Sequence, residues 1–196
     1  SSHLTGNLLT GLNMESQILY LALEVLNIEL NDATSKVIIE NTHNGETKLT
    51  TSGGEDLVEV LATAGPTHIR TGLDRDIVSI QSIGAMMTVR TGSSSDVVNV
   101  GSLAPKTGGL LDGFQGPLSV DGELGDDQLN LDDSGDRSQN IGHLTSSVLT
   151  GLGVSDDITY FVEELNIDLG TARDVFNIQS SHIGETNLTT STGKDT

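Results

Sequence analysis

Apolar and polar residues alternate with a period of two in short runs along most of the chain. One set of runs carries Val58 and Val60, Val78 and Ile80, Val98 and Val100, Leu129 and Leu131, and Phe176 and Ile178. A second set, rich in threonine, carries Leu49, Ile69, Val89, Val120 and Leu188. Because side chains two residues apart point to the same face of a strand, both sets predict strands with one buried face. We expect the two sets to oppose each other across a narrow aliphatic core.

The strand pattern recurs at a short, regular spacing. Asp56, Asp76 and Asp96 are 20 residues apart, and each begins one of the first set of runs. One such segment cannot bury its own apolar face, but stacked segments bury it and pair each strand with neighbours about 4.8 Å away. The sequence therefore predicts an all-β fold, a parallel β-solenoid of the β-roll or β-helix kind, with coils of about 20 residues.

A longer repeat encloses the short one. His3 matches His143 at an offset of 140 residues, and Leu26 matches Leu165 at an offset of 139. The chain thus holds one unit of about 140 residues and the first part of a second unit. We expect an entry segment at 1–25, regular coils at 26–131, an inserted excursion at 132–164 and coils of the second unit at 165–196.

Irregular stretches and the ends of the chain carry further expectations. Residues 101–117 predict a longer loop, and 144–152 predict a strand with a glycine turn inside the excursion. The run 20–26 has a helix-like spacing, but its counterpart from Tyr160 leads into a strand, so we predict an extended segment. The chain begins with Ser1 and shows no signal peptide, so we expect it to be a piece of a longer protein.

Composition narrows the classes of partner. Nine Lys and Arg face 28 Asp and Glu, which gives a net charge of −19. A phosphate-binding surface needs clustered cations, so the composition argues against nucleic acid and anionic membrane surfaces as partners. No apolar run approaches the roughly 20 residues of a membrane helix. Aromatic residues make up 3% and Trp is absent, which argues against a core or sugar-binding platform built on large rings.

Acidic turns are the first candidate site. Aspartates that begin strand-like segments are Asp56, Asp76, Asp96, Asp127, Asp174 and Asp195, and Asp74 adds charge to one turn. Stacking would place successive carboxylates about one strand spacing apart, where they repel unless a cation or hydrogen bonds compensate. Ca²⁺ prefers several oxygen ligands and would suit such a column. The alternative is that each aspartate caps its own turn by accepting backbone N–H bonds. Both interpretations stay open.

The turn Gly54-Glu55-Asp56-Leu57-Val58 resembles half of the hemolysin-type (RTX-like) calcium-binding repeat, Gly-Gly-x-Gly-x-Asp-x-aliphatic-x. The resemblance is degenerate, since Asp74 and Ser94 replace a motif glycine. It implies that Asp carboxylates and turn carbonyls of adjacent coils enclose Ca²⁺. A second acidic loop contains Asp132 and Asp136 and offers either another calcium site or a solvated acidic loop.

Other signals are weaker. Histidines occur in repeat-related pairs, His3 with His143 and His43 with His182, so repetition explains them without a metal. Asn187 begins an N-glycosylation sequon and should point outward from its strand. Phosphate-loop and nucleophile-elbow motifs are absent, and so is cysteine. We therefore predict that the chain is not an enzyme.

The pattern as a whole resembles secreted adhesin-like tandem-repeat proteins. The resemblance implies an extracellular or cell-surface structural or adhesive module, such as a stalk, a scaffold or a filament segment. Its partners would be neighbouring repeats or further copies head to tail, with cell-surface or matrix ligands. The alternative is a carbohydrate-active parallel β-helix enzyme. A groove with three or more convergent acids and an arginine would favour that alternative.

Overall fold

Strands make up all the regular structure in the residues that the computed structural model describes, which are 1–12 and 14–196. In chain order the strands are β1 (Ser2–Leu4), β2 (Leu8–Thr10), β3 (Ile18–Leu19), β4 (Val25–Glu29), β5 (Lys36–Ile39), β6 (Glu46–Thr50), β7 (Leu57–Val60), β8 (Thr67–Gly72), β9 (Ile77–Ile80), β10 (Met87–Ser93), β11 (Val97–Val100), β12 (Leu118–Leu124), β13 (Gln128–Asp132), β14 (Ile141–Leu144), β15 (Val148–Gly151), β16 (Ile158–Phe161), β17 (Glu164–Asp168), β18 (Val175–Ile178) and β19 (Glu185–Thr189). Across these ranges no helix has the length and apolar character needed to cross a membrane. The all-β prediction is confirmed.

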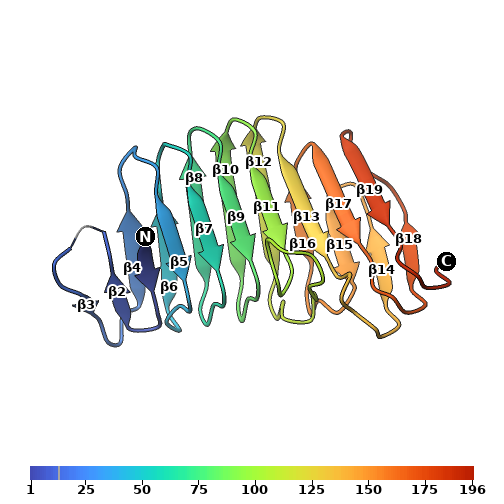
Figure 1. Cartoon of the computed structure of the whole chain (residues 1–196), viewed down its shortest axis with the longest axis horizontal. Coiled ribbons are helices and arrows are strands. Elements are labelled where there is room, and N and C mark those ends of the chain that lie inside the picture. The colour runs from blue at the N-terminus through green and yellow to red at the C-terminus, as the bar shows by residue number, and fades with distance from the viewer. Residues whose placement is uncertain (13) are drawn as a thin grey trace.

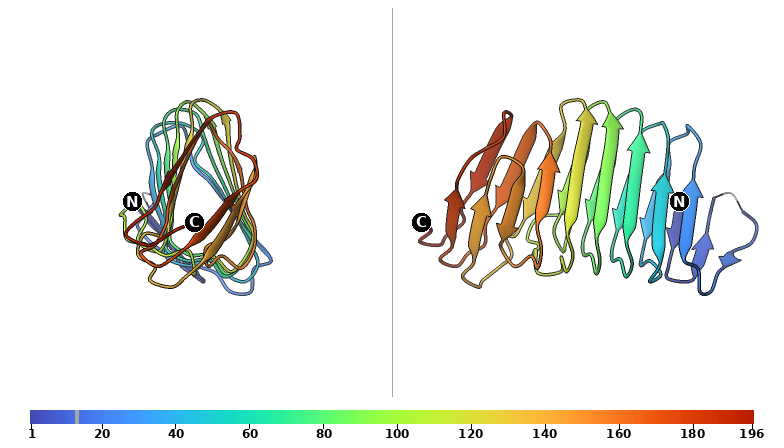
Figure 2. Two further views of the ribbon diagram at one scale, coloured as in Figure 1. Left: turned by 90° about the vertical axis from the view of Figure 1, so that its right-hand side faces the viewer. Right: turned by 180° about the vertical axis from the view of Figure 1, so that it is seen from behind.

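The strands form two sheets that run the length of the molecule (Figure 1). One sheet has ten strands in the order β19-β17-β13-β11-β9-β7-β5-β1-β2-β3, and the other has nine in the order β18-β14-β15-β16-β12-β10-β8-β6-β4. From β4 to β13 each strand lies in the opposite sheet from the one before it, and neighbours within a sheet are parallel. Seen along the long axis, the two sheets face each other (Figure 2).

The register of the sheets aligns the predicted core residues. In the ten-stranded sheet Val58 pairs with Val78, and Val78 pairs with Val98. In the nine-stranded sheet the aligned residues are Leu49, Ile69 and Val89. All six side chains are at most 2% exposed. Burying each of them contributes roughly 1.5–3 kcal/mol to stability, so the thin core depends on many aligned aliphatic columns.

Strands of the second unit occupy the opposite sheets from their counterparts in the first unit. β4 lies in the nine-stranded sheet, whereas β17 lies in the ten-stranded sheet. The prediction that Phe176 and Ile178 join the Val58 column is therefore wrong, as is the prediction that Leu188 joins the Leu49 column. The first unit consists of one antiparallel group, which lies in one sheet and counts as one pass, followed by the ten alternating strands β4 to β13, which makes eleven passes. This odd number of passes returns the chain to the other sheet.

Antiparallel groups interrupt the parallel pattern at the start of each unit. β14, β15 and β16 form such a group, and β16 then pairs in parallel with β12. The entry segment contains the matching group β1, β2 and β3. We predicted only one strand in this part of the excursion, because the turn at 145–147 lacks the glycine or proline that usually marks a hairpin.

The predicted extended run at 20–26 is only partly extended. The segment 20–24 is irregular, with a left-handed bend at Ala22 (φ 53°), and a strand begins at Val25. The loop at 101–117 is longer than the other turns, as predicted. It buries Leu111 and Phe114, and Phe114 forms a bridge to Ile83. This loop therefore belongs to the packed structure and gives the acidic residues that follow β13 a surface to bind.

Candidate functional site

The turns before β7, β9, β11 and β13 bring four aspartates into one column, which we call the aspartate ladder: Asp56, Asp76, Asp96 and Asp127. The backbone N–H of Asp56 donates to Asp76 Oδ1 at 2.8 Å, and that of Asp76 donates to Asp96 Oδ1 at 2.8 Å. The N–H of Asp96 donates to Asp127 Oδ1 at 2.9 Å. Each carboxylate thus binds the turn of the preceding layer. The prediction that each aspartate caps its own turn is wrong in this respect, although the hydrogen bonds themselves are present.

Asp174 and Asp195 form a separate, shorter ladder. The N–H of Asn140 donates to Asp174 Oδ1 at 2.8 Å, and the N–H of Asp174 donates to Asp195 Oδ1 at 2.9 Å. The Asp174 turn leads from the ten-stranded to the nine-stranded sheet, whereas the Asp56 turn leads the other way. The two ladders therefore lie on opposite edges of the sheet pair.

The backbone of the turns explains why the glycine motif is degenerate. Gly54, Asp74 and Ser94 occupy equivalent positions and all have positive φ, at 85°, 69° and 91°. Asp74 is exposed, and its Oδ2 accepts the N–H of Gly54 at 3.1 Å. Asp tolerates the left-handed region better than most residues. The turn conformation therefore persists where the sequence lacks the glycine.

Burial sets the electrostatics of the aspartate ladder. Its four side chains are at most 3% exposed. Desolvation is the main cause that raises the pKa of all four carboxyls, to about 6 for Asp76 and Asp127. The Oδ2 atoms of Asp56, Asp76 and Asp96 are buried and have no hydrogen-bond partner among the described residues. The ladder therefore favours proton uptake more than an exposed carboxyl does.

Calcium binding by these turns stays a hypothesis. One oxygen of each ladder carboxylate is occupied by a backbone N–H bond, and the second oxygens of Asp56, Asp76 and Asp96 are enclosed. Within residues 1–12 and 14–196, no three His, Asp or Glu side chains are grouped in a way that could hold a metal ion. Calcium would have to draw ligands from turn carbonyls or require a rearranged turn.

The aspartates at the end of β13 and in the loop that follows it are buried, so the prediction that they are solvated is wrong. Asp132, Asp133 and Asp136 are at most 8% exposed. Asp132 Oδ2 accepts the N–H of Gly109 at 2.7 Å, and Asp133 Oδ1 accepts the N–H of Leu111 at 3.0 Å. These carboxylates therefore bind the backbone of the 101–117 loop. Asp133 belongs to the acidic loop that the sequence indicated, but it was not among the predicted ligands Asp132 and Asp136.

The pKa of Asp133 is raised further than those of Asp76 and Asp127. Desolvation, followed by the charges of Asp136 and Asp112, raises its pKa to about 7, against the N–H bond from Leu111. Asn140 Nδ2 donates to both Asp133 Oδ2 and Asp136 Oδ2. Asp133 will therefore exchange a proton near neutral pH.

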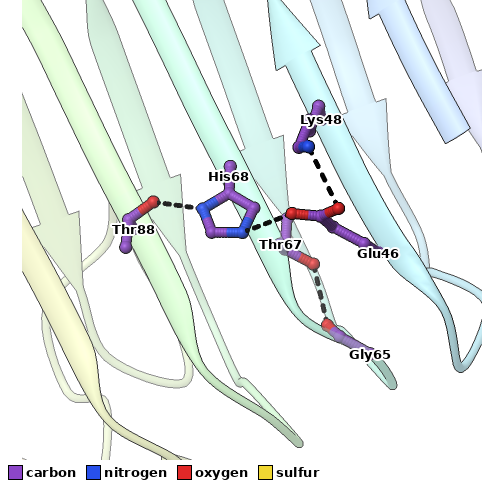
Figure 3. Close-up of polar contacts among 6 residues, drawn as sticks. All are labelled: Glu46, Lys48, Gly65, Thr67, His68 and Thr88. Carbon is purple, nitrogen blue, oxygen red and sulfur yellow. Dashed lines mark hydrogen bonds and ion pairs between the residues drawn. The ribbon is translucent and has the colours of Figure 1, made fainter. Parts of the chain in front are cut away.

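A second candidate site lies on the outer face of the nine-stranded sheet (Figure 3). Glu46 contacts Lys48 Nζ at 3.0 Å and His68 Nε2 at 3.1 Å. His68 Nδ1 shares a 2.7 Å hydrogen bond with Thr88 Oγ1. These residues come from β6, β8 and β10, which are adjacent in the sheet. The sequence carried a signal, since Lys48, Arg70 and Arg90 fall at outward positions of successive repeats. The strand register places Lys48 opposite His68 and Arg70 opposite Arg90.

An asparagine ladder follows the outer face of the ten-stranded sheet. Asn130 Nδ2 donates to Asn99 Oδ1 and Asn166 Nδ2 to Asn130 Oδ1, both at 2.9 Å. Asn187 Nδ2 donates to Asn166 Oδ1 at 3.0 Å. Asn187 is exposed and lies on the outer face as predicted, but its amide nitrogen already takes part in the ladder.

Comparison with known proteins adds no relative. No protein-family model, curated protein or solved structure matches the chain. The resemblance to calcium-binding and adhesin-like repeats therefore stays a prediction, and function must be argued from the geometry.

Proposed function

We propose that the chain is a segment of a parallel β-solenoid that serves outside the cell as a structural or adhesive rod. One observation carries the proposal. β16 and β17 of the second unit pair in parallel with β12 and β13 of the first unit. The second unit thus continues both sheets of the first without a break, which is how a tandem-repeat stack grows.

The first unit has the same elements without a cover. β3 and β4 correspond to β16 and β17, but they lie at the ends of their sheets. Ile18 in β3 is 49% exposed, whereas its counterpart Ile158 is 1% exposed. A preceding unit would cover this edge with strands equivalent to β12 and β13. Neighbouring repeats are therefore the proposed partners, and cell-surface or matrix ligands remain a prediction.

The exchange of sheets between units gives the proposed rod a regular form. The second unit begins in the sheet opposite to the one in which the first unit began, and further units would alternate in the same way. Corresponding side chains would therefore appear on alternate faces of the rod, unit after unit. A rod of this kind displays any outward-facing ligand site on both sides. This supports a scaffold or adhesive role. The proposed role involves no catalysis.

A copy of the chain's own strands tests the proposal. A variant carrying residues 101–140 ahead of Ser1 places a second β12 and β13 before β1. We expect a higher melting temperature and slower amide exchange across 18–29. The matched control is the same extension with its copies of Leu118, Val120, Leu129 and Leu131 changed to Ser, which cannot dock. If amide exchange across 18–29 is unchanged in the variant with the intact extension, a preceding unit does not continue the sheets through strands equivalent to β12 and β13.

The calcium part of the proposal has its own test. A ligand that binds only the folded chain raises the melting temperature with concentration. Thermal melting with Ca²⁺, with Mg²⁺ and with a chelator therefore separates calcium-stabilised turns from turns held by backbone hydrogen bonds alone. A rise with Ca²⁺ that Asp76→Asn abolishes would place the ion at the ladder. Equal midpoints in all three conditions would remove calcium from the proposal and leave the rod unaffected.

A further inference from the structure

Two rows of outward side chains run along the nine-stranded sheet, across the strands. One row contains Lys48, His68, Thr88 and Ser119, which are paired in register from β6 to β12. The other row contains Thr50, Arg70, Arg90, Asp121 and Phe161, paired in register from β6 to β16. Leu49, Ile69 and Val89 lie between the rows, and the groove has a volume of about 580 Å³. We call it the outer groove.

The outer groove concentrates positive charge in a chain with a net charge of −19. It holds three of the nine Lys and Arg residues, Lys48, Arg70 and Arg90. Arg70 pairs directly with Arg90 across β8 and β10, and like charges placed opposite each other destabilise a sheet. Arg90 Nη1 lies 3.9 Å from Glu123 Oε1, whereas Arg70 forms no ion pair with any described residue. An anion between the two guanidinium groups would relieve this repulsion.

The neighbouring groups indicate what kind of anion would fit. Thr50, Thr88 and Ser119 offer hydroxyl groups along the groove, and Asp121 offers an acceptor. Phe161 lies at one end, and its side chain is largely exposed, at 58%. An exposed ring gives a flat apolar surface beside polar groups, which suits the apolar face of a sugar ring. Glu46 contacts Lys48 and His68, so these two side chains are positioned before any ligand arrives.

We propose that the outer groove binds a linear polysaccharide that carries carboxylate groups. Arg70 and Arg90 would bind the carboxylates through paired N–H donors, an arrangement that planar guanidinium groups favour. The hydroxyl groups and Asp121 would bind sugar hydroxyls, and Phe161 would contact a ring face. An acidic peptide offers carboxylates without such ring faces, so it would bind Arg70 and Arg90 without contacting Phe161. The proposal goes beyond the structural role, because it assigns the ligand of one face.

Calorimetry with a short oligogalacturonate, a linear chain of carboxylated sugars, tests the proposal. We expect measurable binding that is lost when the carboxylates are methyl-esterified. Arg70→Gln and Arg90→Gln should each weaken binding by about tenfold or more, because each removes charged hydrogen bonds. Lys106→Gln is the matched control, since it removes one exposed positive charge outside the groove. Thermal melts verify that all variants remain folded, which outward positions should allow.

Phe161→Ala and a second probe separate a sugar ligand from an acidic peptide. We expect Phe161→Ala to weaken oligogalacturonate binding severalfold and to leave the weaker binding of polyglutamate unchanged. Three results would overturn the proposal. The first is no binding of oligogalacturonate by the unaltered chain, and the second is a loss of affinity with Lys106→Gln equal to that with the arginine variants. The third is polyglutamate binding as tight as oligogalacturonate binding, with Phe161→Ala weakening neither. The last result would assign the groove to an acidic peptide.

Discussion

The chain contains the start of its long unit twice, once at the end of the sheets, where no described strand covers it, and once stacked on β12 and β13. Ile18 is 49% exposed in the first copy, and Ile158 is 1% exposed in the second. Leu26 is half-buried, whereas its counterpart Leu165 is fully buried. The residue types match, so the difference comes from β12 and β13, which cover only the second copy. Burial in this molecule is therefore supplied by the neighbouring unit.

Local contacts are the same in both copies. Tyr20 donates a hydrogen bond to the carbonyl of Thr5, and Tyr160 donates one to the carbonyl of Thr145. Tyr20 meets His43 edge-on with ring centroids 5.9 Å apart, and Tyr160 meets His182 in the same way at 5.6 Å. These contacts explain why the tyrosines and histidines recur at the repeat spacing. They form within one unit and do not require the neighbour.

The largest expected difference between the two copies comes from a matched pair of core truncations. Ile158→Ala should lower the free energy of unfolding by about 2–5 kcal/mol, because it opens a cavity in a packed column. Ile18→Ala should lower it by less than about 1 kcal/mol, because half of that side chain already faces water. Denaturant titration of both variants measures the difference. Equal losses would mean that the uncovered edge is packed in solution.

A second pair extends the comparison to the ladders. Asp76→Ala leaves the buried N–H of Asp56 without an acceptor and should cost about 1–3 kcal/mol. Asp195→Ala removes the same bond to Asp174, but Asp195 is only half-buried at the open end, so water can replace it. We expect a loss under about 1 kcal/mol there. Asp76→Asn keeps an oxygen acceptor and should fall between them. A harmless Asp76→Ala would show that the ladder does not hold the layers.

The sequence predicted the features that repeat along the chain, and it missed the features that depend on strand register. Spacing of 20 residues and alternation placed Val58, Val78 and Val98 in one column correctly, because those signals are local and periodic. The exchange of sheets at β17 depends on how many passes a unit makes, which no single segment contains. The meeting of Arg70 and Arg90, and the burial of Asp133 under the 101–117 loop, depend in the same way on pairs of distant segments. For that reason the sequence pointed to the aspartates of the ladder but not to the backbone N–H groups of the neighbouring turns that donate to their carboxylates.

Acidification should raise the stability of the folded chain. The pKa values of Asp76 and Asp127 are raised to about 6 and that of Asp133 to about 7, all above the value of the unfolded chain. The folded state therefore binds more protons between about pH 7.5 and pH 4, so stability rises as the pH falls through this window. Thermal melts from pH 7.5 to 5 measure the rise. Asp133→Asn should flatten its upper part, and a melting temperature that falls over this range would contradict the buried, protonatable carboxyls.

The smallest expected effect concerns the asparagine ladder, which again differs between the two copies. Asn166 bonds to Asn130 and receives the amide of Asn187, whereas its counterpart Asn27 lies on β4 at the open edge. Asn166→Ala should therefore cost about 0.5–1.5 kcal/mol and Asn27→Ala close to nothing. Denaturant midpoints compare the two variants. If the extension by residues 101–140 docks, Asn27 gains a partner equivalent to Asn130. Asn27→Ala should then cost more than in the unextended chain but less than Asn166→Ala, because Lys48 and not an asparagine lies on the other side of Asn27. A cost that stays near zero would show that the added strands pair in another register.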